Sequence, residues 1–337
     1  MKIADMHCDT ISRILKNRRR WNPASGSNPA RDSALHSSFI LRSNPFQVDL
    51  EKMGRSGYVL QNFAIFVDFG ETEHPIQDCW EQIRIFQEEM AKNRDLISPA
   101  ATYGEIVQNQ REGKMSALMT LEEGALCQGS LERLRQFYDI GVRMMTFTWN
   151  YPNSLGDPAQ NNLGRSHQGL TPLGMEFLEE MERLGMIPDV SHLSDQGIRD
   201  VCRLARKPFC ASHSNARSLC PHGRNLPDTL IRGISERGGI IGANYYGAFL
   251  DPKPDSLGRF YSAAAKIADH IRHISNIGGI SCIGLGSDFD GIDENLEMKD
   301  CSHMELLAQA LRKKGFHESE IEKIFYKNVL GFYRETL

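Results

Sequence analysis

Histidine and carboxylate side chains end several short apolar runs of this sequence, and their types and spacing suit a site for divalent metal ions. The first pair is His7 and Asp9, two residues apart at the end of a run that begins almost at the first residue. Alternate residues of an extended strand face the same side, so the imidazole and the carboxylate are expected to point together beyond the strand. They would supply half of a metal site.

Glu122, His192 and His213 end three later apolar runs and are the candidates for the other half. Three histidines and two carboxylates are more ligands than one tetrahedral zinc ion uses, and they suit two metal ions about 3.5–4 Å apart. Glu122 is the natural bridging ligand, because it is the only strong ligand from the middle strands. Glu123, one residue on, is expected to face away as a helix-capping or solvated charge.

Eight apolar runs alternate with amphipathic stretches, which predicts eight strands separated by helices. This alternation implies parallel pairing through right-handed crossovers, and eight strands close a (β/α)8 TIM barrel. An open doubly wound sheet is the alternative, but neither G-x-G-x-x-G nor a P-loop follows the first run. Barrel enzymes carry their sites at the carboxyl ends of the strands, where the candidate ligands fall. The predicted strands are 2–8, 59–68, 116–122, 142–149, 187–192, 208–213, 239–246 and 282–289.

The chain of 337 residues is predicted to form a single domain, 1–337, without internal repeats. A long loop is expected at about 16–45, and a closing helix at about 318–334. His270 and His273 lie three residues apart in a predicted helix, where a solvated face is a simpler interpretation than a metal clamp. The other predicted helices are 77–93, 103–113, 130–140, 173–185, 194–206, 226–237, 260–277 and 303–314.

The composition is that of an ordinary globular protein, with 40% hydrophobic and 24% charged residues. A net charge of −4 gives no electrostatic reason to expect nucleic acid or an anionic membrane as a partner. No apolar run reaches the roughly 18 residues that a membrane span needs. Eight cysteines without a C-x-x-C pair are typical of reduced thiols. A cytoplasmic enzyme is therefore the simplest interpretation.

The runs that end in candidate ligands extend into longer motifs. They include residues 5–10 (DMHCDT), 121–124 (LEEG), 168–172 (QGLTP), 189–192 (DVSH), 212–214 (SHS), 224–228 (RNLPD) and 286–291 (GSDFDG). In this order and at these separations they resemble the membrane (renal) dipeptidases and their bacterial relatives, zinc peptidases of family M19. The resemblance covers nearly the whole length.

The resemblance implies a (β/α)8 barrel with a binuclear zinc centre. It implies that His7 and Asp9 bind one zinc ion, that His192 and His213 bind the other, and that Glu122 bridges them. Manganese or cobalt would also suit nitrogen and oxygen ligands. A homodimer is expected from the family, although nothing in the sequence marks its interface.

The resemblance also assigns roles to residues outside the ligand set. Arg224 would receive the terminal carboxylate of the substrate, and Asp288 would be the catalytic acid/base. The chain departs from the mammalian enzymes at Trp149, where they have a histidine that stabilises the tetrahedral intermediate. An indole N–H is a donor and cannot act as an acid or base. Trp149 and the neighbouring Asn150 remain substrate-binding candidates beside the developing oxyanion.

The predicted reaction is metal-dependent hydrolysis of dipeptides, including those with a D-residue at the C-terminal position, by a hydroxide held between two zinc ions. Hydrolysis of a lactone, cyclic amide or phosphoester on the same barrel is an alternative. Many such binuclear barrels use a carboxylated lysine, and no lysine occurs between Lys114 and Lys207. A peptide- or metal-binding protein that has lost catalysis through Trp149 is a third hypothesis.

Overall fold

A computed structural model of the chain describes residues 1–20, 39–159, 168–292 and 295–337. All eight predicted strands are present, and their bounds differ from the predicted spans by a few residues. They are β1 (Ile3–Asp5), β2 (Tyr58–Phe66), β4 (Met115–Glu122), β5 (Val142–Thr146), β6 (Ile187–Asp189), β7 (Cys210–Ala211), β8 (Ile240–Ala243) and β9 (Ile283–Leu285).

These strands form a closed parallel barrel, as predicted. Neighbours pair in the order β1, β2, β4, β5, β6, β7, β8 and β9, and β9 pairs back with β1. The longest pairing runs from Leu60 opposite Ser116 to Phe66 opposite Glu122, between β2 and β4. A short strand that the sequence did not predict, β3 (Ile97–Pro99), pairs with the beginning of β4 outside the ring.

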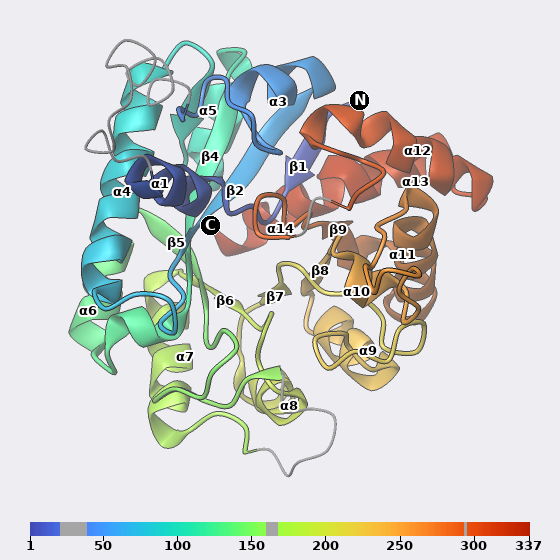
Figure 1. Ribbon diagram of the computed structural model, residues 1–337. Coiled ribbons are helices and arrows are strands. Elements are labelled where there is room, and N and C mark those ends of the chain that lie inside the picture. Colours follow the sequence, from blue (N-terminus) through green and yellow to red (C-terminus); the bar gives the residue numbers. More distant parts are fainter. Residues whose placement is uncertain (21–38, 160–167, 293–294) are drawn as a thin grey trace.

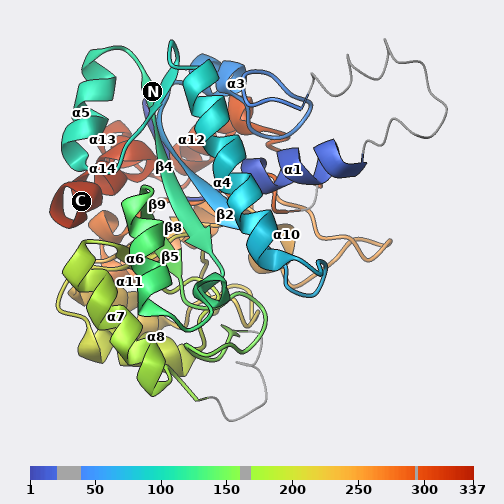
Figure 2. The same cartoon turned by 90° about the vertical axis from the view of Figure 1, so that its left-hand side faces the viewer.

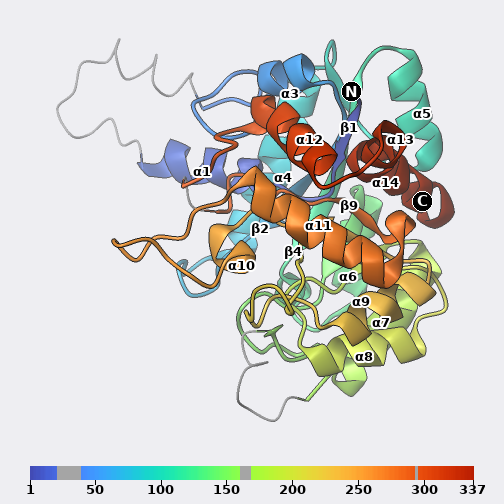
Figure 3. The same ribbon diagram turned by 90° about the vertical axis from the view of Figure 1, so that its right-hand side faces the viewer.

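Amphipathic helices surround the barrel (Figure 1), and α11 and α12 cross its outer face in Figure 3. Their ends carry the expected signals: Thr171 and Ser194 accept backbone N–H groups as N-caps, and Gly185 ends a helix with φ 85°. These caps fix the start of α7 and α8 and the end of α7. The main surrounding helices are α4 (Pro75–Lys92), α5 (Tyr103–Arg111), α6 (Leu131–Asp139), α7 (Pro172–Leu184), α8 (Asp195–Leu204), α9 (Asp228–Glu236), α11 (Ala264–Gly278) and α12 (Met304–Lys313).

The expected loop at about 16–45 begins later than predicted, because residues Thr10–Arg20 form helix α1. Its apolar residues Ile11, Ile14 and Leu15 are buried, and its basic end pairs with carboxylates of α4. These tertiary contacts stabilise a helix that extends into the region where a loop was predicted. Another helix, α3 (Leu50–Ser56), follows the remainder of the predicted loop, of which residues 21–38 lie outside the described part.

The closing helix is present as α13 (Glu318–Glu322), a π-helical turn (Lys323–Lys327) and α14 (Asn328–Thr336). Figure 2 shows α14 on the opposite side of the molecule from α1. Its Phe332 and Tyr333 pack against apolar residues of β1, β4 and β5. The amino end of the barrel interior is therefore closed by an apolar plug. None of the described helices is long and apolar enough to cross a membrane.

Candidate metal centre

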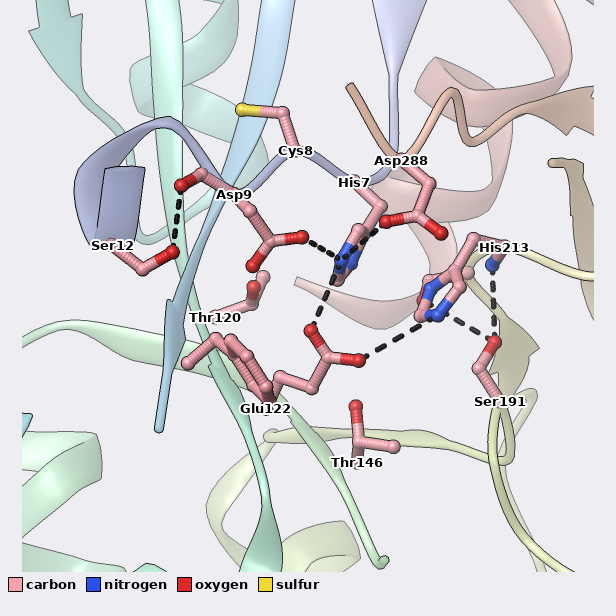
Figure 4. Close-up of polar contacts among 12 residues, drawn as sticks. His7, Cys8, Asp9, Ser12, Thr120, Glu122, Thr146, Ser191, His213 and Asp288 are labelled. Atoms are coloured by element: carbon pink, nitrogen blue, oxygen red, sulfur yellow. Dashed lines mark hydrogen bonds and ion pairs between the residues drawn. The ribbon is translucent and has the colours of Figure 1, made fainter. Parts of the chain in front are cut away.

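The backbone beyond β1 carries His7 and Asp9 into the mouth of the barrel. His7 Nε2 lies 3.3 Å from Asp9 Oδ2 and 3.1 Å from Glu122 Oε2. Cys8, between them, is directed away (Figure 4), and its Sγ donates to the carbonyl of Asn62. The i, i+2 spacing therefore brings together the two side chains that the sequence paired.

The other two candidate histidines approach the second oxygen of the same glutamate. His192 Nε2 is 3.1 Å and His213 Nε2 is 3.6 Å from Glu122 Oε1. Glu122 thus has one oxygen toward His7 and the other toward the second pair. All five predicted ligands are brought together and buried, with at most 8% of any residue exposed.

Hydrogen bonds at the Nδ1 atoms of His192 and His213 determine that their Nε2 atoms carry the free lone pairs. Ser212 Oγ donates to Asp189 Oδ2 at 2.5 Å and therefore accepts from His213 Nδ1 at 2.8 Å. The side-chain Oδ1 of Asn150 lies 3.2 Å from His192 Nδ1 and accepts a hydrogen bond from it. Both Nε2 atoms are then unprotonated, yet they face each other at 2.9 Å. Two facing lone pairs fit a cation that accepts both.

Charges in the mouth also fit a cation. Two overlapping groups have ligand atoms within 4.8 Å of one another: His7, Glu122 and His213, and His7, Asp9 and Asp288. Burial lowers the pKa of His7, but the carboxylates of Glu122 and Asp9 outweigh it and raise that pKa well above its usual value. His7 Nε2 and Asp9 Oδ1 have no hydrogen-bond partner among the described residues. Imidazole and carboxylate ligands of this kind suit divalent ions such as zinc.

Asp288 lies beside the ligand cluster at the carboxyl end of β9. Its Oδ1 is 3.8 Å from His7 Nε2, and its Oδ2 accepts a hydrogen bond from Asn244 at 2.8 Å. Burial, together with the charges of Asp9 and Glu122, raises its pKa to about 8. A carboxyl group with that pKa can exchange a proton near neutral pH. Its backbone is in the left-handed region, with φ 62°, a conformation that costs a non-glycine residue about 1–3 kcal/mol and is frequent at functional sites.

Arg224 brings a buried positive charge to the same cavity. Only 4% of the residue is exposed, and burial lowers its pKa to about 10. Its Nη2 donates to the carbonyl of His213 at 3.3 Å, while its Nε has no partner among the described residues. The guanidinium also lies over the ring of Phe249, 5.5 Å from its centroid. An arginine held in this way can bind a carboxylate.

These groups line a cavity of about 360 Å³, which also includes Trp149 and Asn150. The Trp149 ring packs against Phe66 with centroids 4.9 Å apart, so two aromatic rings form one wall. Phe66 ends β2 and follows the strand-end rule, Phe249 lies in the short helix α10 (Gly247–Leu250), and the remaining residues come from loops without a periodic pattern. The lining residues that the sequence did not indicate are Phe66, His222, Tyr246, Phe249, Gly291 and Ile292.

Two secondary predictions about individual residues had different outcomes. Glu123 is a cap, because its carboxylate accepts from the backbone of Ala125, but it is buried rather than solvated. The prediction that His270 faces solvent was wrong: it is 1% exposed. Its Nδ1 accepts from the backbone N–H of Ala216, and its Nε2 donates to the carbonyl of Leu250. The imidazole is therefore neutral and lies on the buried face of α11.

Comparisons with known proteins agree with this geometry. A family model described as membrane dipeptidase, peptidase family M19, matches residues 1–336. Dipeptidase tcpJ of Claviceps purpurea (strain 20.1) is 30% identical over 301 residues, which cover 86% of this chain and 69% of that protein. An uncharacterized dipeptidase of Schizosaccharomyces pombe, C965.12, is 32% identical over 86% of this chain and 72% of its own length.

Solved structures show the same fold. A metallopeptidase from Rhodobacter sphaeroides, liganded with a phosphinate mimic of the dipeptide L-Ala-D-Ala, superposes with a TM-score of 0.84 at 24% identity. That match covers 100% of this chain and 99% of the other. A structure described as dipeptidase AC also gives a TM-score of 0.84, at 25% identity, and covers 100% of this chain and 98% of its own.

Proposed function

The chain belongs to the membrane dipeptidase family, peptidase family M19, whose members are metallo-dipeptidases, and on this premise we propose that it hydrolyses unblocked dipeptides with two zinc ions per chain. The observation that carries the proposal is the place of Glu122, whose two oxygens face His7 on one side and His192 and His213 on the other. His7 and Asp9 would hold one ion, and His192 and His213 the other. Manganese or cobalt would fit the same donors.

Bound metal ions would polarise the scissile carbonyl and make a water molecule between them more acidic. The chain's own residues orient the substrate and move the proton. Asp288, whose carboxylate lies beside the proposed ligands, takes a proton from the attacking water and delivers it to the leaving nitrogen. Nitrogen needs this proton before the C–N bond can break.

Replacing Asp288 by Asn tests this role. The amide cannot transfer the proton, so kcat should fall about 10²–10⁴-fold. Metal content should stay at the wild-type level, because Asp288 is outside the proposed ligand set. Metal analysis by mass spectrometry and initial rates with the same dipeptide give both quantities. Full activity in Asp288→Asn would remove the residue from the acid/base role.

Arg224 is proposed to bind the terminal carboxylate, which limits the enzyme to short substrates with a free C-terminus. The cavity of about 360 Å³ is at the small end of the range for small-molecule sites. Arg224→Ala should raise KM for a dipeptide while kcat changes less, and the matching C-terminal amide should be a poor substrate for both proteins. An unchanged KM would refute the carboxylate role.

Trp149 and Asn150, which line the same cavity, are proposed to contact the substrate as well. The indole N–H is a donor that could face the oxyanion, and removing an oxyanion donor typically costs about 10²–10³ in rate. Trp149→Phe keeps the aromatic wall and removes the donor. A loss of kcat in this variant would support oxyanion stabilisation, and an unchanged kcat would leave Trp149 as a wall only.

The first experiment is amino-acid release from a panel of L-Xaa-L-Xaa and L-Xaa-D-Xaa dipeptides by zinc-reconstituted protein. Dipeptides with a C-terminal D-residue belong in the panel because the Rhodobacter sphaeroides relative is liganded with an L-Ala-D-Ala mimic. Release that a chelator abolishes would support the proposal. Absence of release from every member, despite two bound metal ions, would favour another hydrolase reaction or a binding protein.

A homodimer and a cytoplasmic location are part of the proposal. The family resemblance supports the dimer, and light scattering after size exclusion would measure the mass directly. All eight cysteines are free thiols, seven of them buried, which is typical of a reducing compartment. Fractionation of the native cells would test the location.

A further inference from the structure

The segment after β9 runs beside the segment after β1, and the two carry Asp288 and Asp9. The Asp288 backbone N–H donates to the carbonyl of His7 at 3.2 Å, and the Asp9 N–H donates to the carbonyl of Phe289 at 2.9 Å. Cys8 and Phe289 form a parallel bridge between them. The β1–β9 pairing thus continues into the active-site mouth and fixes the spacing of the two segments.

Asp290 ends this pairing with its side chain. Thr10 Oγ1 donates to Asp290 Oδ2 at 2.6 Å, the Gln47 N–H donates to Oδ1 at 2.7 Å, and the Val48 N–H donates to Oδ2 at 3.3 Å. The Asp290 N–H in turn donates to Gln47 Oε1 at 2.5 Å. The carboxylate, in a residue only 6% exposed, therefore joins three segments: the start of α1, the turn at residues 44–49 and its own loop.

The backbone around Asp290 needs such external support. Asp288 and Asp290 have φ of 62° and 70°, in the left-handed region that L-residues rarely adopt. Conformations of this kind persist when the surrounding structure fixes them. Gly291 shows how close the packing is, because a Cβ there would lie 2.2 Å from Asp9 Oδ2 and 2.7 Å from Asp288 Oδ1. A shift of this loop would displace both carboxylates.

We propose that Asp290 is a positioning residue for the reaction: by anchoring residues 287–291 to α1 and to the turn at 44–49, it holds the Asp288 carboxylate where it can protonate the leaving nitrogen. This inference rests on the proposed acid/base role of Asp288. Asp290 itself does not line the cavity and contacts neither the substrate nor the proposed metal ligands. In the supported reaction the water oxygen forms a bond to the carbonyl carbon, the C–N bond breaks, and the proton released by the water passes through Asp288 to the leaving nitrogen.

Asp290→Asn is the direct test. Hydrogen-bond donors face both oxygens of the Asp290 carboxylate. In asparagine one oxygen is replaced by an NH2 group, which cannot accept a hydrogen bond. That group would face a donor, so the loop has to move. A displacement of about 1 Å in a catalytic group can cost on the order of 10² in rate. We expect kcat for a dipeptide to fall about 10–100-fold, with KM and metal content close to wild type.

A pair of substrates separates positioning from general damage. An ester analogue with the same side chains has a hydroxy acid as leaving group, and that oxygen needs a proton far less than an amide nitrogen does. If Asp290 acts through Asp288, Asp290→Asn should lower the rate on the dipeptide much more than on the ester. The ratio of the two rates should fall in the same direction as in Asp288→Asn.

Asp49→Asn is the matched control. Asp49 is another buried carboxylate of the same turn, and it accepts from the backbone of Asn44 at 3.1 Å and Lys52 at 2.7 Å. It caps α3, and its side chain bonds to Asn44 and Lys52 rather than to the loop at 287–291. We expect a lower Tm with an unchanged ratio of dipeptide to ester rates. If Asp290→Asn fails to fold, Gln47→Met removes only the acceptor of the Asp290 N–H and should give a smaller change in the same ratio.

Equal losses on both substrates, or an unchanged kcat in a folded Asp290→Asn protein, would overturn the positioning role. The proposed function fails by a different result, namely that the wild-type protein releases no amino acid from any dipeptide or that Asp288→Asn remains active. In that case the inference falls with it. If the ratio of dipeptide to ester rates changes in Asp288→Asn but not in Asp290→Asn, the positioning role is refuted while the proposed function stands.

Discussion

At the two ends of the barrel interior, buried polar side chains differ in whether they have hydrogen-bond partners. At the amino end, Phe332 and Tyr333 close an apolar cluster, and the polar pair of Asn62 and Tyr333 is hydrogen-bonded in both directions, at 2.7 and 3.0 Å. At the carboxyl end, His7 and Asp9 carry buried atoms without hydrogen-bond partners in the described structure. Satisfied groups stabilise the fold, whereas unsatisfied ones are available to a ligand.

Between these ends lies a polar layer that serves the site. Asp189 accepts hydrogen bonds from Thr146 Oγ1, Ser212 Oγ and the Ser191 and Ser212 backbone N–H groups. Through Ser212 it orients His213, so its carboxylate supports a proposed metal ligand without lining the cavity. A hydrogen-bonded carboxylate, Asp189, therefore lies between the apolar cluster and the cavity. Mutations in the three zones should have different consequences for rate and for stability.

Asp288→Asn is expected to give the largest contrast, because rate and stability should move in opposite directions. The rate loss of about 10²–10⁴ follows from the missing acid/base. In the metal-free protein, however, the Asp288 carboxylate is buried beside the carboxylates of Asp9 and Glu122, and this burial costs folding free energy. The substitution removes that cost. Thermal unfolding in chelator at pH 8 should show a higher Tm than wild type. A lower Tm under these conditions would contradict the interpretation that the buried carboxylates at the carboxyl end of the barrel destabilise the metal-free protein.

Phe332→Ala should have the reverse effect at the other end. The side chain packs in the plug of α14, and truncating a buried phenylalanine costs about 3–5 kcal/mol through lost burial and the cavity left behind. Urea unfolding measures the change in free energy. We expect kcat and KM per folded molecule to match wild type at a temperature where the variant is folded. A comparable loss of kcat would show that the two ends are coupled.

His270 extends the comparison to a buried histidine outside both ends. Unlike His192 and His213, it has a donor for its Nδ1 and an acceptor for its Nε2, and burial lowers its pKa to about 4. The unfolded state binds the proton more tightly, so stability should be complete above about pH 6.5 and fall as pH drops toward 4.

Substitution by glutamine isolates this titration. Between pH 7 and pH 5 the free energy of unfolding of the wild-type protein should fall by about 2 kcal/mol more than that of His270→Gln, since one pKa unit corresponds to about 1.4 kcal/mol. Urea unfolding at the two pH values gives the difference. Parallel losses in both proteins would show that His270 does not titrate as its contacts indicate.

The strand-end rule is the reason that the sequence predicted so much of the site. His7, Glu122 and His213 each end or follow a strand of a parallel barrel, so topology alone brings them to one edge. Residues such as His222 and Tyr246 come from loops, whose course no periodic pattern determines. The loops therefore supplied the part of the cavity that the sequence could not indicate.

Tertiary contacts explain the other differences. Helix α1 carries a basic run that is typical of a solvated segment, and only its ion pairs with α4 and its buried Ile11 and Ile14 reveal a packed helix. The role of Asp290 likewise depends on Gln47, 243 positions away in the sequence. Contacts at such separation leave no local signal, whereas strand and helix periodicity do.

The smallest expected effect concerns the polar pair within the plug. Tyr333→Phe leaves the amide of Asn62 buried with an unmade hydrogen bond, which should cost about 1 kcal/mol or somewhat more. Asn62→Leu in the same protein replaces the remaining partner, and the double variant should recover part of the loss. Urea unfolding of the four proteins of this cycle measures the coupling. A positive coupling with unchanged kcat would establish that polar groups at the amino end serve stability alone, and strictly additive losses would show that Asn62 finds another partner.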